Sequence, residues 1–134
     1  MADTVTSQTI HDSDRVAILK FTNESDGTGE SSVKKVDVSA LKSDSKGRSC
    51  SGVSISRIHW FCRGMGVDLE FDATTNVLAV TLPADSSGDE YFDQFTGIPN
   101  NAGSGVTGDI DFTTVGHSNG DAYSIILILS KNYS

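Results

Sequence analysis

Residues 67–83, VDLEFDATTNVLAVTLP, decide the fold class of this chain. In the first part Val67, Leu69 and Phe71 alternate with three carboxylate residues, which is the period of a strand with one buried face. Residues 73–76 then form a break of hairpin length before a second apolar run. The stretch therefore predicts two antiparallel strands that place one face in a hydrophobic core.

The same period of two recurs over most of the chain. Further strands are expected at 15–23, 32–41, 54–61, 109–115 and 122–131, and residues 4–10 are either another strand or a flexible arm. Clusters of Gly, Asn, Asp and Ser separate the runs, and no window has the spacing of an amphipathic helix. The pattern predicts an all-β fold: residues 15–134 as a single β-sandwich or jelly-roll-like domain with long glycine-rich loops, after an N-terminal arm or first strand at 1–14.

The final run, AYSIILILSK at 122–131, is almost continuously apolar. A strand of this composition is expected to be buried on both faces, either in the centre of a sheet or at a subunit contact.

Composition and charge exclude several classes of function. The 134 residues suit one domain, and the formal net charge is -8, with Lys131 the one basic residue after Arg63. Nucleic-acid binding requires clustered Lys and Arg, so we expect no nucleic-acid partner. No apolar run reaches the length of about 18 residues that suggests a membrane span. The first residues lack the basic and apolar segments of a signal peptide, so we expect synthesis and use on the cytosolic side.

The stretch FTGIPNNAGSGVTGDIDFTT at 95–114 contains a dinucleotide-like glycine spacing, GSGVTG. A dinucleotide site needs a strand before this motif and a helix after it, whereas here a strand follows. We therefore interpret the segment as an ordered loop bent by glycines, which either contacts a partner or packs on its own core.

Candidate chemical groups are present without a catalytic arrangement. The row Asp68, Glu70 and Asp72 suits a calcium ladder or paired acids, but also an ordinary exposed face paired with Arg57 and His59. The three histidines are scattered, no nucleophile elbow is present, and Cys50 and Cys62 are too few for a structural zinc site. Both cysteines are expected to be reduced thiols, with a disulfide left open, and Trp60 is expected in the core rather than as a platform for sugar stacking. We expect no enzyme activity, no metal, no cofactor and no small-molecule substrate.

The segments GMGVDLEFD, GIPNNAG and GDAYSIIL, with ILKFTNESDGTGESSVKKVDVSAL upstream, resemble a family of small proteins of tailed bacteriophages, especially phages of marine bacteria. The similarity extends over most of the chain from about Val16. Members of this family are uncharacterised or are virion structural proteins, so the resemblance implies a virion component made in the host cytoplasm.

A β-sandwich without catalytic residues suits a capsid decoration, or cement, protein. Such a protein would lie on the capsid surface, bind the major capsid protein and stabilise the head, by analogy as a homotrimer. The expected subunit or capsid contacts are apolar or uncharged residues of the glycine loop and the last strand: Phe95, Ile98, Pro99, Asn100, Asn101, Val106, Ile126 and Ile128.

Two other functions remain open from the sequence. One is a tail or fibre component, and the other is a carbohydrate-binding β-sandwich module. The low aromatic content of 7% and the position of Trp60 within an alternating strand count against the carbohydrate-binding module.

Overall fold

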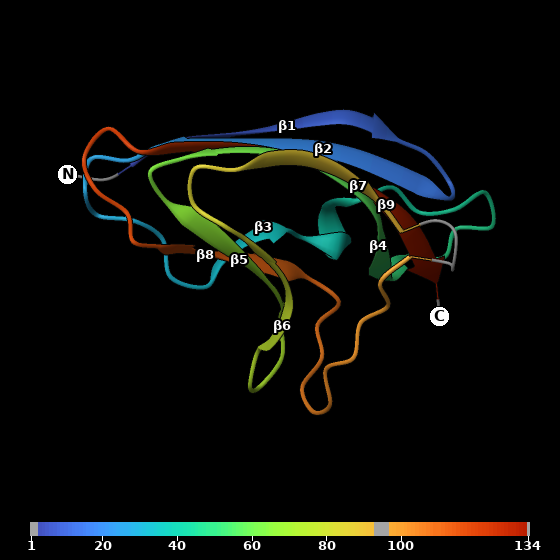
Figure 1. The fold of residues 1–134 in the computed structure, drawn as a ribbon. Coiled ribbons are helices and arrows are strands. Elements are labelled where there is room, and N and C mark those ends of the chain that lie inside the picture. Colours follow the sequence, from blue (N-terminus) through green and yellow to red (C-terminus); the bar gives the residue numbers. More distant parts are fainter. Residues whose placement is uncertain (1–2, 93–96, 134) are drawn as a thin grey trace.

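The computed structural model describes residues 3–92 and 97–133, which form two stacked antiparallel sheets (Figure 1). The five-stranded sheet has the order β1-β2-β9-β4-β7 and the four-stranded sheet the order β3-β8-β5-β6. The strands are β1 (Thr4–Asp12), β2 (Val16–Glu24), β3 (Val33–Val36), β4 (Cys50–Arg63), β5 (Gly66–Phe71), β6 (Val77–Leu82), β7 (Ser87–Tyr91), β8 (Ile110–Val115) and β9 (Ala122–Tyr133). No helix in these described ranges is long and apolar enough to cross a membrane.

Without β1, the order β2-β9-β4-β7 over β3-β8-β5-β6 is that of an eight-stranded jelly roll. The prediction of an all-β sandwich is therefore confirmed. Residues 4–12 form a strand that pairs with β2, but the side chains from Thr4 to His11 are exposed. The first strand is thus an addition at the sheet edge rather than part of the two-layer core.

The core lies between the two sheets because alternate residues of each strand face inward. Phe21 of β2 meets Phe112 of β8 edge to face at 5.3 Å between ring centroids, and Phe112 meets Tyr123 of β9 at 5.8 Å. Such edge-to-face pairs suit the charge distribution of aromatic rings and link the two layers. The largest fully buried side chains are Phe21, Phe71, Phe112, Ile55, Ile58, Met65, Leu69, Leu82, Ile110, Ile125, Leu127 and Leu129.

The structure corrects three details of the predicted strands. The run at 32–41 is divided into β3 and a short 3-10 helix, Val38–Ala40, which begins at Asp37 because that carboxylate accepts the Ser39 amide. Strand β7 was not predicted, since its residues read as a turn. Strand β9 is central, as expected, but only its inward face is buried, while its outward face is half-buried.

Both cysteines are buried free thiols, and they lie in the same strand β4. Twelve residues of extended chain span about 40 Å, which is far beyond disulfide reach. Burial, and secondly the charge of Asp85, raises the pKa of Cys62 to about 11, so its thiol is a poor nucleophile at neutral pH.

Candidate functional site

The predicted contact residues fall into two separate groups. Ile98 pairs its backbone with Ile55 and packs partly against the core, whereas Pro99, Asn101 and Val106 are exposed and Asn100 is half-buried in the loop below the sandwich (Figure 1). Ile126 and Ile128 lie on the outward face of β9, in the middle of the five-stranded sheet. Phe95 lies outside the described residues. These residues therefore do not form one continuous surface.

The glycine loop is held closely against β4. Gly108 has a φ of +88°, and a Cβ there would lie 2.2 Å from the Ser51 carbonyl oxygen. Only glycine fits such an approach, which supports the interpretation of an ordered loop. The segment after the loop is β8, so no helix follows the glycine spacing.

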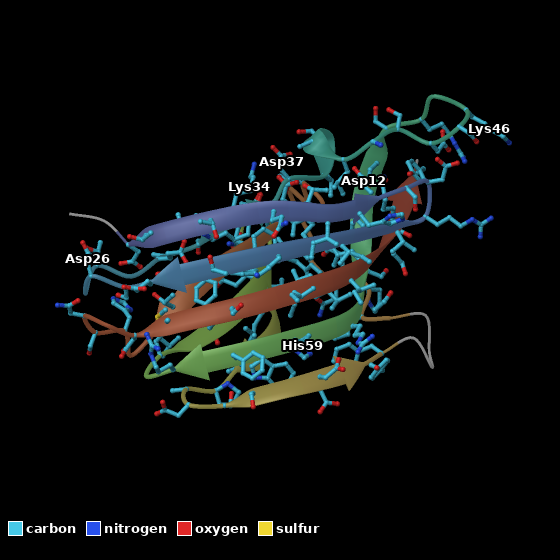
Figure 2. The ribbon with its side chains drawn as sticks, turned by 90° about the horizontal axis from the view of Figure 1, so that it is seen from above. Asp12, Asp26, Lys34, Asp37, Lys46 and His59 are labelled. Carbon is cyan, nitrogen blue, oxygen red and sulfur yellow. The ribbon has the colours of Figure 1, made fainter. Side chains whose placement is uncertain are left out.

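A different surface gathers exposed aromatic and charged side chains on the outward face of β4 and β7. Arg57, His59 and Phe61 point outward from β4, and the register places Arg57 opposite Tyr91 and His59 opposite Asp89. We call these five residues the aromatic strip. Figure 2 shows His59 on this face, seen from above the five-stranded sheet.

One end of the aromatic strip is a fixed stack of charged and aromatic groups. The Arg57 guanidinium donates from Nε to Asp89 Oδ1 at 2.7 Å, and its Cζ lies 4.1 Å from the centre of the Tyr91 ring. This hydrogen bond and the adjacent positive charge hold the pKa of Asp89 below its ordinary value. The Tyr91 side chain is nevertheless 49% exposed.

Phe61 forms the other end and is 56% exposed, which is unusual for a phenylalanine. The His59 ring meets it edge to face at 5.5 Å between centroids. Beside Phe61 is a shallow hollow of about 320 Å³ that Arg63 and Ser124 also line. The Arg63 guanidinium donates to the carbonyl of Gly120 at 3.0 Å, so it is held at the rim of this hollow.

Packing on the core side of β4 and β7 holds the two strands of the aromatic strip in place. Trp60 points inward, packs against the core, and donates from Nε1 to Ser86 Oγ at 3.0 Å. Its ring occupies the space beside Gly88, where a Cβ would lie 2.6 Å from the ring. Because Gly88 has no side chain, β7 can pair with β4 beside the Trp60 ring. Trp60 packs against the core and is not part of the aromatic strip.

A larger hollow of about 560 Å³ lies at the end of the sandwich, near Arg15 and the end of β9. Its aromatic residue, Tyr133, is already engaged: the hydroxyl donates to the Asp14 carbonyl, and the Arg48 guanidinium lies 5.7 Å from the ring centre. Arg48 is in turn paired with Asp44. Tyr133 is also less exposed than Phe61 and Tyr91, so this hollow offers a ligand less aromatic surface than the strip does.

The sequence correctly predicts that Arg57 and His59 lie on an exposed strand face. It does not predict the aromatic strip, because the strand that carries Asp89 and Tyr91 was not expected. Their predicted partners lie in the other sheet, Asp68 and Glu70 on β5 and Asp72 directly after it. Asp89 of β7 takes their place as the partner of Arg57. No alternation of polar and apolar residues in 87–91 (SGDEY) signals β7, so local periodicity could not have found this strand. No group of three or more His, Cys, Asp or Glu side chains in the described part of the chain is arranged to hold a metal.

Comparison with known proteins gives structural likenesses only. No family model and no curated protein matches the chain. A solved structure of a family 29 carbohydrate-binding module has 11% identity and a TM-score of 0.42, and covers 96% of this chain and 89% of that one. A mutant of a family 29 module has 11% identity and a TM-score of 0.43, with 96% and 93% covered. Another mutant, complexed with cellulohexaose, has 12% identity and a TM-score of 0.42, with 95% and 91% covered.

These findings correct the expectation of a capsid decoration protein. The structures that resemble the chain are carbohydrate-binding modules, so that expectation is wrong and is not carried further. Neither the family resemblance nor the homotrimer and virion location is tested by any comparison, and they stay predictions. Because the identities and TM-scores are low, the ligand of this chain has to be argued from its own residues.

Proposed function

We propose that the chain is a non-catalytic carbohydrate-binding module that holds a glycan chain along the aromatic strip. The observation that carries this proposal is the exposure of Phe61 and Tyr91 on one flat sheet face, with fixed polar groups between them. Tyr91 lies opposite Arg57, four residues along β4 from Phe61, so the two rings are about 13 Å apart along the strand. That spacing suits the stacking of two sugar rings of one oligosaccharide.

The chemistry of the strip matches that of a sugar. The C–H face of a pyranose ring is apolar and carries partial positive charge, so it stacks on the negative face of an aromatic ring. The hydroxyl groups at the rim of the sugar need donors and acceptors, which Arg57, Asp89 and His59 supply. Since Arg57 and Asp89 neutralise each other, the strip favours a neutral glycan over an acidic one.

The polar groups are held in place before a ligand arrives. The fork of Arg57 on Asp89 and its stacking on Tyr91 fix three side chains in one arrangement. Preorganised groups lose little conformational entropy on binding, which favours affinity from a small surface. Among the described residues the strip holds one carboxylate, Asp89, so the strip as proposed binds a glycan without cleaving it.

Isothermal titration calorimetry with soluble neutral hexasaccharides tests the proposal. Cellulohexaose, mannohexaose and laminarihexaose together cover different backbone shapes, and we expect at least one to bind. Phe61→Ala and Tyr91→Ala should each weaken that binding about tenfold or more, because each removes one stacking platform of roughly 1–2 kcal/mol.

Leu78→Ala is the matched control. Leu78 is 54% exposed and apolar, but it lies on β6 of the other sheet, so its replacement should leave the affinity unchanged. If none of the hexasaccharides binds at millimolar concentration, or if Leu78→Ala weakens binding as much as Phe61→Ala, the proposed site is wrong.

A further inference from the structure

The hollow at the end of the sandwich is not used by the aromatic strip. Its volume of about 560 Å³ lies within the range of roughly 300–1,000 Å³ that is usual for small-molecule sites. Three segments line it: the turn between β1 and β2, the loop at 44–48 and the last residues of β9. Figure 2 shows Asp12 and Lys46 at this end of the molecule. The hollow is therefore large enough to hold a small ligand.

Basic side chains from two of these segments reach the hollow: Arg15 from the turn, and Lys46 and Arg48 from the loop. Arg15 is fixed through its backbone, because its carbonyl accepts from the Lys131 amide at 2.8 Å. The exposed side chains of Arg15 and Lys46 have no acceptor among the described residues. Their charges can therefore meet an anion from solution.

The loop at 44–48 is closed around one carboxylate, which fixes the position of its basic residues. Asp44 accepts from the amide of Lys46 at 3.0 Å, and from the amide and Nε of Arg48 at 2.8 and 2.7 Å. Arg48 thus uses Nε for Asp44, while its Nη1 and Nη2 have no acceptor in the described part of the chain. Two nitrogens of a held guanidinium can therefore donate to a ligand in the hollow.

The charge of the hollow has the opposite sign to that of the whole chain. Lys131 also lines it, but its ammonium is paired with Asp12 at 2.6 Å. Of the other charged lining residues three are cations, and two, Asp14 and Asp44, are carboxylates. The formal net charge of the chain is -8, so the hollow is a local reversal of sign that attracts anions.

The hollow opens close to one end of the aromatic strip. Arg57 of the strip is opposite Ile128 of β9, and Ser130, which lines the hollow, lies two residues further along that strand, about 7 Å away. The Ser130 hydroxyl also lies 2.6 Å from that of Ser56, the residue before Arg57. A glycan chain that continues past the Arg57 end of the strip can therefore reach the hollow.

We propose that the hollow binds the oxyanion of an acidic sugar residue, a carboxylate or a sulfate, in a glycan whose neutral residues lie on the aromatic strip. Guanidinium groups match such oxyanions because their planar N–H donors bind two oxygens at once, and an ammonium adds a compact positive charge. The preference for an anion rests on the lining of the hollow alone. The choice of a sugar as the carrier of the anion rests on the proposed function.

NMR titration of the isotopically labelled protein at low ionic strength tests the proposal. The ligands are trigalacturonate for a carboxylate, a sulfated carrageenan oligosaccharide for a sulfate, and maltotriose as the neutral control. We expect at least one acidic ligand to shift the amides of residues 14–16 and 44–48, and maltotriose to leave them in place. Raising NaCl to about 0.5 M should weaken the binding, because salt screens exposed charges. Inorganic phosphate should bind more weakly than the acidic sugar, since it has no ring to contact the rest of the hollow.

Two variants that each remove one charge locate the site. Arg15→Gln and Lys46→Gln change side chains without an acceptor among the described residues, so both variants should fold as the wild type does. Each should weaken binding of the acidic ligand about three- to tenfold, because each removes a charged donor. Lys20→Gln is the matched control, because Lys20 lies on the outward face of β2 and does not line the hollow. It removes the same charge and should leave the affinity unchanged.

This proposal and the proposed function can fail separately. Phe61→Ala should leave the shifts at the hollow unchanged, and Arg15→Gln should leave the binding of a neutral hexasaccharide unchanged. The proposal is overturned if neither acidic ligand shifts these amides at about 10 mM, or if Lys20→Gln weakens binding as much as Arg15→Gln does. It is also overturned if inorganic phosphate binds as tightly as the acidic sugars, because the hollow would then recognise a free anion rather than a sugar.

Discussion

Lys131 shows how one residue joins distant parts of this chain. Its ammonium is fully buried at the end of β9 and donates to Asp12 Oδ1 at 2.6 Å and to the carbonyls of Ser13 and Lys42 at 2.8 Å each. Although burial lowers the pKa of Lys131, the hydrogen bonds and charges of Asp12 and Tyr133 together outweigh it and raise the pKa overall. The three donors of the ammonium are therefore all used, which makes burial of the charge tolerable.

Replacement of this lysine should be strongly destabilising. In Lys131→Met the Asp12 carboxylate stays buried without its cation, and we expect a loss of about 3 kcal/mol in the free energy of unfolding by urea denaturation. Adding Asp12→Leu to this variant should restore part of the loss, because no unpaired charge remains. A double variant that loses as much as the sum of the two single variants would contradict the interpretation.

The ion pair of Lys131 and Asp12 also predicts how the stability of the protein depends on pH. Burial raises the pKa of Asp12, but the hydrogen bonds from Lys131 and the Lys42 amide and the charges of both lysines together outweigh it. The folded-state pKa of Asp12 therefore lies below the unfolded value. The contribution of Asp12 to stability is therefore present above about pH 4 and is lost as the pH falls through the lower folded-state pKa. Lys131→Met should show a shallower decline of stability in this acidic range.

At the scale of the element, β7 depends on the absence of a side chain at Gly88. A branched side chain there would collide with the Trp60 ring, which lies within 2.6 Å of an added Cβ. We expect Gly88→Val to lose about 1–3 kcal/mol of stability through overpacking and to displace Trp60 toward water. Because Trp60 is the one tryptophan of the chain, a red shift of its fluorescence reports the change directly.

Gly88→Val should also weaken the proposed glycan binding, since β7 carries both Asp89 and Tyr91. Gly103→Ala is the control, because nothing lies within 4 Å of a Cβ at that position. An unchanged emission spectrum in Gly88→Val would show that β7 is not fixed by this contact.

At the scale of the whole molecule, the position of each strand in its sheet predicts how easily it opens, and the central strand β9 and the edge strand β1 should differ most. β9 lies between β2 and β4, and its inward residues Ile125, Leu127 and Leu129 are fully buried. β1 pairs on one side only, and its residues from Thr4 to His11 are exposed. Opening β1 therefore breaks few apolar contacts, whereas opening β9 disrupts the core.

Hydrogen–deuterium exchange measured by mass spectrometry should follow this order. We expect the amides of β1 to exchange much faster than those of β9, with the latter near the rate for global unfolding. Equal protection of the two strands would contradict the view that β1 is an addition to an eight-stranded jelly roll.

The sequence by itself determined the fold class and most strands, because period-two alternation is a local property of a half-buried strand. Val67, Leu69 and Phe71 are buried as their alternation predicts, and Ile58 and Arg57 face opposite sides of β4. β7 was missed because its glycine and acidic residues carry the local signal of a turn.

Only the tertiary structure decided which side chains meet. Arg57 pairs with Asp89 across 32 positions of sequence, and Asn76 donates to Asp111 across 35 positions. Each of these residues reads as an ordinary polar position of a strand or a turn. Strand order and the packing of the loops determine their partners and burial, and these depend on contacts between remote segments that local periodicity does not encode.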